Sequence, residues 1–176
     1  MLRITLLAAI LAVSTILFSS LGFAGKVTDS GVLVAPHLVK GTKFWEFRTK
    51  IMEGSTEGTN FADRYTLVTW GCGTECQTGV AIDRVTGKLY WLPTAAYGYK
   101  FDRDSRLLVV NPNAREDYLR VSDLAGTGVI PNWLFREMYI LKNDHFVRVG
   151  QDKGEPGSPT LNEVLAHYYI IPVNAD

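Results

Sequence analysis

The feature that most constrains the fold is a change in hydrophobic period near Asn60. From that point apolar, aromatic and β-branched residues alternate with polar ones, a period of two that is typical of β-strands. Strands are expected over residues 65–70, 78–84, 88–92, 107–110, 118–121, 135–142 and 146–149. The strands follow one another without intervening helices, so the pattern favours antiparallel pairing over a parallel βαβ sheet.

Two turn sequences predict how neighbouring strands are joined. Residues 83–88 read DRVTGK, and Gly87 can take the positive φ that a tight hairpin turn needs. Residues 143–145 read NDH and predict a second hairpin between the last two strands.

Two helices are expected outside the sheet. Apolar residues at i, i+3 and i+7 predict a helix over residues 42–55. Thr160 and Glu163 have the spacing of a capping box, which predicts a short helix over 161–168, with a strand through 169–171 as the alternative. The fold class is therefore mainly β (α+β): an antiparallel sheet or sandwich of about seven short strands, with one N-terminal helix and a short C-terminal helix.

The first 24 residues have the order of a secretory signal. Arg3 gives a positive start, residues 4–18 form an apolar run, and Gly22 and Ala24 are small residues before a cleavage site. The run is shorter than the ~20 residues of a spanning helix, although an uncleaved anchor is the alternative. We expect a signal peptide at 1–24, a single β-rich domain at 25–176, and no stable membrane insertion after cleavage.

The charge balance narrows the range of partners. The chain has 18 basic and 18 acidic residues, and removing Arg3 with the signal leaves 18 − 1 = 17 against 18. A nucleic-acid-binding protein would show a basic surplus, so no nucleic-acid partner is expected.

Both cysteines lie within the stretch WGCGTECQ at residues 70–77. In an oxidising compartment two such close thiols normally pair, and Gly71 and Gly73 allow the backbone angles of a short closed loop. We expect a Cys72–Cys76 disulfide that shapes a tight bend between two strands.

Two other interpretations of the cysteines are less consistent with the spacing. Exchange catalysts usually have two residues between the cysteines rather than three, and Glu75 would oppose a thiolate. A metal site needs two more ligands, and His37, His145 and His167 are all distant in sequence. No metal or other cofactor is expected.

Three motifs resemble those of a family of small exported bacterial proteins. They are N-F-A-x-x-Y at residues 60–65, W-G-C-G-T-x-C at 70–76 and D-x-x-T-G-K at 83–88. The resemblance extends over residues 44–112 and implies export and a related fold. The family has no established activity, so the resemblance implies none for this chain. Thr59, Asp63 and Arg64 stand where the family pattern has Pro, Gly and His, so a proton-transfer role of that histidine would not carry over to Arg64.

No catalytic residue is assigned. The sequence shows no catalytic pairing of a nucleophile or carboxylate with any of the three histidines, since Asp144 and His145 belong to an expected hairpin turn. The G-x-S-x-G and H-E-x-x-H motifs are missing from the chain. Asp102 and Asp104 have the chemistry of a Ca²⁺ site or a glycosidase pair, but with Arg103 and Arg106 nearby a surface ion-pair cluster is the simpler interpretation.

The candidate binding residues surround the cysteine loop and the first hairpin: Trp70, Thr74, Glu75, Trp91, Tyr97 and Tyr99. Exposed aromatic residues near a rigid loop suit protein or glycan recognition, with burial under a loop or a second sheet as the alternative. We expect a periplasmic or secreted binding module, of inhibitor or immunity type, whose partner is a protein or glycan of the cell envelope. The alternatives are an envelope enzyme (a hydrolase or thiol-disulfide exchanger) and a purely structural envelope protein.

Overall fold

The computed structural model describes residues 33–113, 131–154 and 157–168. Contacts divide the chain into Met1–Ser30 and Gly31–Asp176, and all of the described residues lie in the second part. The expected signal at 1–24, the expected strand at 118–121 and the alternative strand at 169–171 lie outside the described residues.

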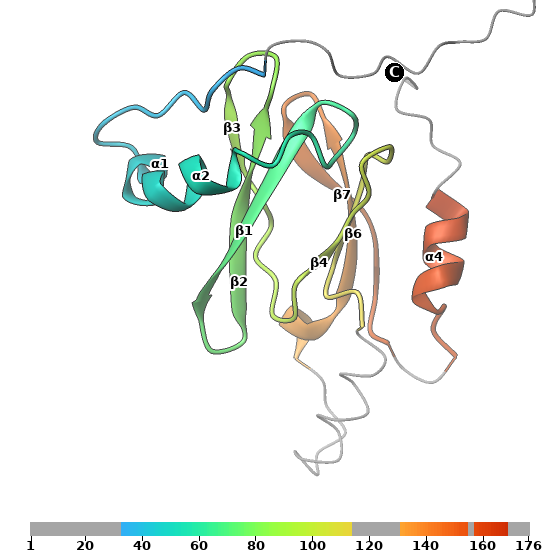
Figure 1. Ribbon diagram of the computed structural model, residues 1–176. Coiled ribbons are helices and arrows are strands. Elements are labelled where there is room, and N and C mark those ends of the chain that lie inside the picture. Colours follow the sequence, from blue (N-terminus) through green and yellow to red (C-terminus); the bar gives the residue numbers. More distant parts are fainter. Residues whose placement is uncertain (1–32, 114–130, 155–156, 169–176) are drawn as a thin grey trace, which may run out of the picture. The chain divides into compact units, whose positions relative to one another are not determined.

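Two antiparallel sheets form the centre of the described structure (Figure 1). Sheet A has the order β1-β2-β3 and sheet B the order β4-β5-β6-β7. The strands are β1 (Tyr65–Gly73), β2 (Cys76–Asp83), β3 (Leu89–Trp91), β4 (Tyr99–Lys100), β5 (Leu107–Val110), β6 (Arg136–Lys142) and β7 (His145–Asp152). The expected mainly β, antiparallel α+β fold is confirmed. The two-residue strand β4 had no signal in the sequence.

The main core lies between the two sheets. Leu67 of β1 and Ala81 of β2 belong to the same buried cluster as Leu108, Val110 and Leu141 of sheet B. Full burial of a leucine or valine side chain contributes ~1.5–3 kcal/mol. This cluster holds the sheets face to face.

The N-terminal helical segment covers the outer face of sheet A. It consists of α1 (Lys43–Glu46) and α2 (Arg48–Gly54), which are separated at Phe47, so the expected single helix is interrupted. Ile51 of α2 packs on Val68, Val80 and other apolar residues of this face. A Cβ at Gly54 would lie 2.4 Å from Val68 Cγ1, so the glycine allows close contact between helix and sheet.

The C-terminal helix α4 (Leu161–Tyr168) covers the outer face of sheet B. Its Val164 is buried with Leu107, Val109 and Met138. The capping box is confirmed, since the Thr160 amide donates to Glu163 Oε2 at 2.6 Å and the Glu163 amide lies 3.3 Å from Thr160 Oγ1. A 3₁₀ helix, η1 (Asn132–Leu134), precedes β6. No helix in the described ranges is long and apolar enough to span a membrane.

The β6–β7 hairpin is closed by Asn143 and Asp144, both of which have positive φ (49° and 65°). This is the backbone pattern of a two-residue type I′ turn. His145 therefore begins β7, whereas the sequence placed it in the turn.

The turn between β2 and β3 is organised by one buried carboxylate. Arg64 donates to Asp83 through Nε at 3.0 Å and Nη2 at 2.6 Å. The Val85 amide and the Thr86 hydroxyl donate to the same carboxylate at 2.9 and 2.8 Å. Gly87 has φ +75°, as expected, and a Cβ there would lie 2.5 Å from a carbonyl oxygen of the N-terminal segment. Burial alone would raise the pKa of Asp83, but these hydrogen bonds outweigh it and lower the pKa from 3.8 to about 2.

Replacing Asp83 by asparagine should lower the free energy of unfolding at pH 7 by about 2 kcal/mol, because the charged hydrogen bonds of the turn are lost. Folding lowers this pKa, so the stabilisation is complete above the ordinary carboxyl pKa of 3.8 and disappears as the pH falls through about 2. Urea unfolding of wild type and D83N should therefore converge between pH 4 and pH 2. Asp102→Asn is the control, because its 3.6 Å pair with Lys100 is partly exposed and contributes little to stability. Equal stability of D83N and wild type at pH 7 would contradict the role given to this turn.

Candidate functional site

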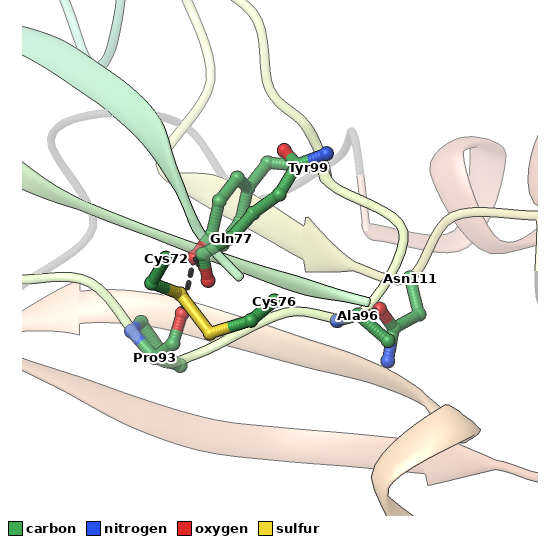
Figure 2. The surroundings of a disulfide bond; sticks show 7 residues. All are labelled: Cys72, Cys76, Gln77, Pro93, Ala96, Tyr99 and Asn111. Carbon is green, nitrogen blue, oxygen red and sulfur yellow. Dashed lines mark hydrogen bonds between the residues drawn. A yellow bond between two sulfur atoms is a disulfide. The ribbon is translucent and has the colours of Figure 1, made fainter. Parts of the chain in front are cut away.

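The two cysteines form a disulfide at the end of the β1–β2 hairpin (Figure 2). Their Cα atoms are 5.1 Å apart, and the β1–β2 register shifts between Gly71 and Gly73. The expected Cys72–Cys76 bridge is confirmed. Residues 71–75 are all exposed. We call residues 71–76 the disulfide tip.

The base of the disulfide tip is held by the segment that follows β3. The Gln77 amide donates to the Ala95 carbonyl at 2.7 Å, and the Ala95 amide donates back to the Gln77 carbonyl at 2.9 Å. The Tyr99 hydroxyl lies 3.0 Å from the Gln77 carbonyl and 2.7 Å from that of Pro93, and the three residues are close together in Figure 2. Burial raises the pKa of Tyr99 above its usual range. On the tip itself, the Tyr97 hydroxyl donates to Glu75 Oε1 at 2.8 Å.

Asn111 connects this segment to η1. Its Oδ1 accepts hydrogen bonds from the amides of Ala96 and Tyr97 at 2.8 and 3.0 Å. Its Nδ2 donates to the carbonyls of Trp133 and Phe135 at 2.9 and 3.1 Å. Asn111 is 2% exposed and has φ +50°, a conformation that asparagine tolerates. One side chain thus fixes two loops that are far apart in sequence.

A hollow of about 550 Å³, which we call the sheet groove, lies beside the disulfide tip. Glu75 and residues 94–96 line it from the sheet A side. Glu137, Arg148 and Gln151 line it from sheet B, and Asn111, Asn132 and Trp133 complete the lining. The Trp133 side chain is 51% exposed.

The polar centre of the sheet groove is Glu137. The Arg148 Nη1 atom donates to Glu137 Oε1 at 2.5 Å, and the Tyr139 hydroxyl donates to Oε2 at 2.8 Å. Burial and the hydrogen bond to Glu137 raise the pKa of Tyr139 to about 12. Glu137 likewise raises the pKa of Arg148. At neutral pH the Tyr139 phenol that supports Glu137 is therefore neutral, and Glu137 and Arg148 form an ion pair in the lining of the groove.

The expected binding residues fall into two groups. Thr74 and Glu75 are exposed on the disulfide tip, and half-buried Tyr97 and Tyr99 hold that tip in place. The two tryptophans lie on the outer face of sheet A, among the residues that pack against the helices. Trp70 is 8% exposed and stacks on Phe47, and half-buried Trp91 stacks on Phe44.

Four residues of the sheet groove were not predicted from the sequence: Trp133, Glu137, Arg148 and Gln151. One sequence feature indicated a polar site here. Glu137, Tyr139 and Leu141 lie on one face of an expected strand, and along that face the residues change from polar to apolar. The sequence did not show which segments face that strand.

The other chemically suggestive residues do not form a centre. Asp102 and Asp104 lie in the loop between β4 and β5 rather than on a strand, and Asp102 pairs with Lys100 at 3.6 Å. His145 Nδ1 contacts the carbonyl of Asn143 at 2.8 Å. Among the described residues, no group of three or more His, Cys, Asp or Glu side chains is placed to hold a metal ion.

Comparison with known proteins identifies no relative: no family model matches the chain, and no curated protein or solved structure matches it. The site is therefore interpreted from its own geometry.

Replacing both cysteines by serine should lower the free energy of unfolding by roughly 2 kcal/mol, which is the chain-entropy value for a five-residue loop. The antiparallel sheets should persist, because their core lies elsewhere. Urea unfolding and far-UV circular dichroism measure the two effects. Alkylation of natively isolated wild-type protein should detect no free thiol, and a full complement of two thiols would contradict the disulfide.

Replacing Asn111 by alanine should lower the free energy of unfolding by about 3 kcal/mol, because two amides and two carbonyls lose their partner. Hydrogen exchange at the amides of Ala96 and Tyr97 should accelerate more than at β2. Asn113→Ala is the matched control, since Asn113 is exposed. Unchanged exchange at Ala96 in N111A would show that another contact holds this segment.

Proposed function

We propose that the protein is an exported binding module, acting in the periplasm or outside the cell, that recognises a macromolecule of the cell envelope through its disulfide tip. An inhibitor or immunity-type role fits this proposal. The observation that carries it is a run of five exposed residues, 71–75, held rigidly at the end of a hairpin.

Rigidity is the physical advantage of this tip. Binding costs free energy when a loop must be ordered, and a loop that is already ordered avoids most of that cost. The Cys72–Cys76 bridge closes the tip, the Gln77–Ala95 pair fixes its base, and Tyr97 restrains Glu75. Thr74 and Glu75 are thereby presented to a partner in one conformation.

Export is supported by the disulfide and by the sequence. Disulfides persist in oxidising compartments and are rare in the cytosol. The order of charged, apolar and small residues over 1–24 is that of a secretory signal. The resemblance to a family of small exported proteins is in agreement with both.

The tip can be tested by capture from an envelope extract followed by binding to the purified partner. Thr74→Arg places a long charged side chain on the tip and should reduce partner recovery and affinity at least tenfold. Val85→Arg is the control, because Val85 is 65% exposed in the turn at the other end of β2. Wild type and V85R should bind equally. Failure to recover a stoichiometric partner, or equal binding by T74R, would count against the proposal.

A further inference from the structure

We infer that the sheet groove binds an uncharged saccharide. This inference names a ligand class for the proposed binding module and rests on that proposed function. The groove is the place where the inner face of sheet B changes from apolar to polar. Along β6 the inward residues are Leu141, Tyr139 and Glu137, of which Leu141 belongs to the core between the sheets. On β7, Arg148 lies opposite Tyr139 and Gln151 opposite Glu137, so these two side chains share that face.

Glu137 and the opposite wall of the groove are held in position before any ligand binds. Glu137 accepts hydrogen bonds from Tyr139 and Arg148, which fixes the carboxylate. Asn111 fixes the opposite wall at Ala96 and the backbone of Trp133. Pre-organised donors and acceptors raise affinity because less side-chain entropy is lost on binding.

Trp133 supplies the apolar surface that a sugar ring needs. Among the exposed large hydrophobic side chains of the described residues it is the one aromatic. An indole is a rigid, flat surface with one polar atom, which suits a ligand that is apolar on one face and hydroxylated at its edge. It lines the same hollow as Glu137 and Gln151, so stacking and hydrogen bonding can act on one ligand.

The charge of the groove disfavours an anionic ligand. Its charged lining residues are Glu75, Glu137 and Arg148, a net charge of −1, and the guanidinium is already paired with Glu137. An anionic ligand would meet net repulsion, which argues against phosphate or uronic-acid ligands. Hydroxyl groups both donate and accept hydrogen bonds, so they match a set of carboxylates, amides and a guanidinium.

A peptide fits the groove less well than a saccharide does. Peptide-recognition sites that add a strand or hold an amphipathic helix have pockets or a groove for apolar side chains. Apart from Trp133, the apolar side chains that line the groove are Ala95 and Ala96, which offer single methyl groups. The volume of about 550 Å³ is in the range of ~300–1,000 Å³ typical of small-molecule sites.

The test is calorimetric titration of the full chain with neutral tetrasaccharides, namely chitotetraose, cellotetraose and maltotetraose, and with tetragalacturonate as the anionic probe. At least one neutral tetrasaccharide should bind with a dissociation constant below 1 mM, and tetragalacturonate should bind at least tenfold more weakly. Trp133→Ala and Gln151→Ala should each weaken binding, W133A by tenfold or more. Trp45→Ala is the control, because Trp45 lies on α1, away from the groove, and affinity should not change.

The outcomes separate this inference from the proposed function. If no neutral tetrasaccharide binds but T74R still abolishes capture of an envelope partner, the saccharide assignment is wrong and the binding module stands. If a protein partner is captured and its binding depends on Trp133, the groove is a protein interface and the saccharide assignment is wrong. If a tetrasaccharide is cleaved, the groove is an enzyme site and both proposals fall.

Discussion

Strands β1 and β2 carry apolar side chains on both faces, so each face must be buried against another part of the structure. Leu67 and Ala81 point toward sheet B, whereas Val68, Val80 and Ile82 point the other way. A second sheet covers one face and the α1–α2 segment covers the other. Sheet B repeats the pattern, since Leu108 faces sheet A and Val109 faces α4. The layered arrangement in Figure 1 follows from this two-sided burial.

Residues of the N-F-A-x-x-Y segment, 60–65, have structural roles. The Asn60 side chain exchanges hydrogen bonds with both the amide and the carbonyl of Leu67. Asp63 has φ +52°, a left-handed conformation that glycine adopts most readily. Arg64 donates two hydrogen bonds to the carboxylate of Asp83. These positions stabilise turns and strand ends of sheet A.

Features that depend on neighbouring residues could be predicted from the sequence, and features that depend on distant ones could not. Strand β5, the positive φ of Gly87 and the Thr160–Glu163 capping box each arise within a few residues and were predicted correctly. The division into two sheets depends on how strands pair, which local patterns do not encode. The sheet groove combines Glu75 with Glu137 and Arg148, and the burial of Trp70 depends on its stacking with Phe47.

Two ion pairs of the β6–β7 hairpin differ in burial, and this difference gives them different roles. Arg136 and Asp152 are register partners whose side chains are 1% and 13% exposed, and Arg136 also donates to the Pro159 carbonyl at 2.8 Å before α4 begins. That pair is enclosed, and it ties the C-terminal helix to sheet B. Glu137 and Arg148 occupy the other face, where the groove leaves the guanidinium about half exposed. Polar residues on the inward face of a sheet stabilise the core less than apolar residues would. Natural proteins place polar residues on such a face mainly at binding or catalytic sites. In this protein the polar inward residues line the sheet groove.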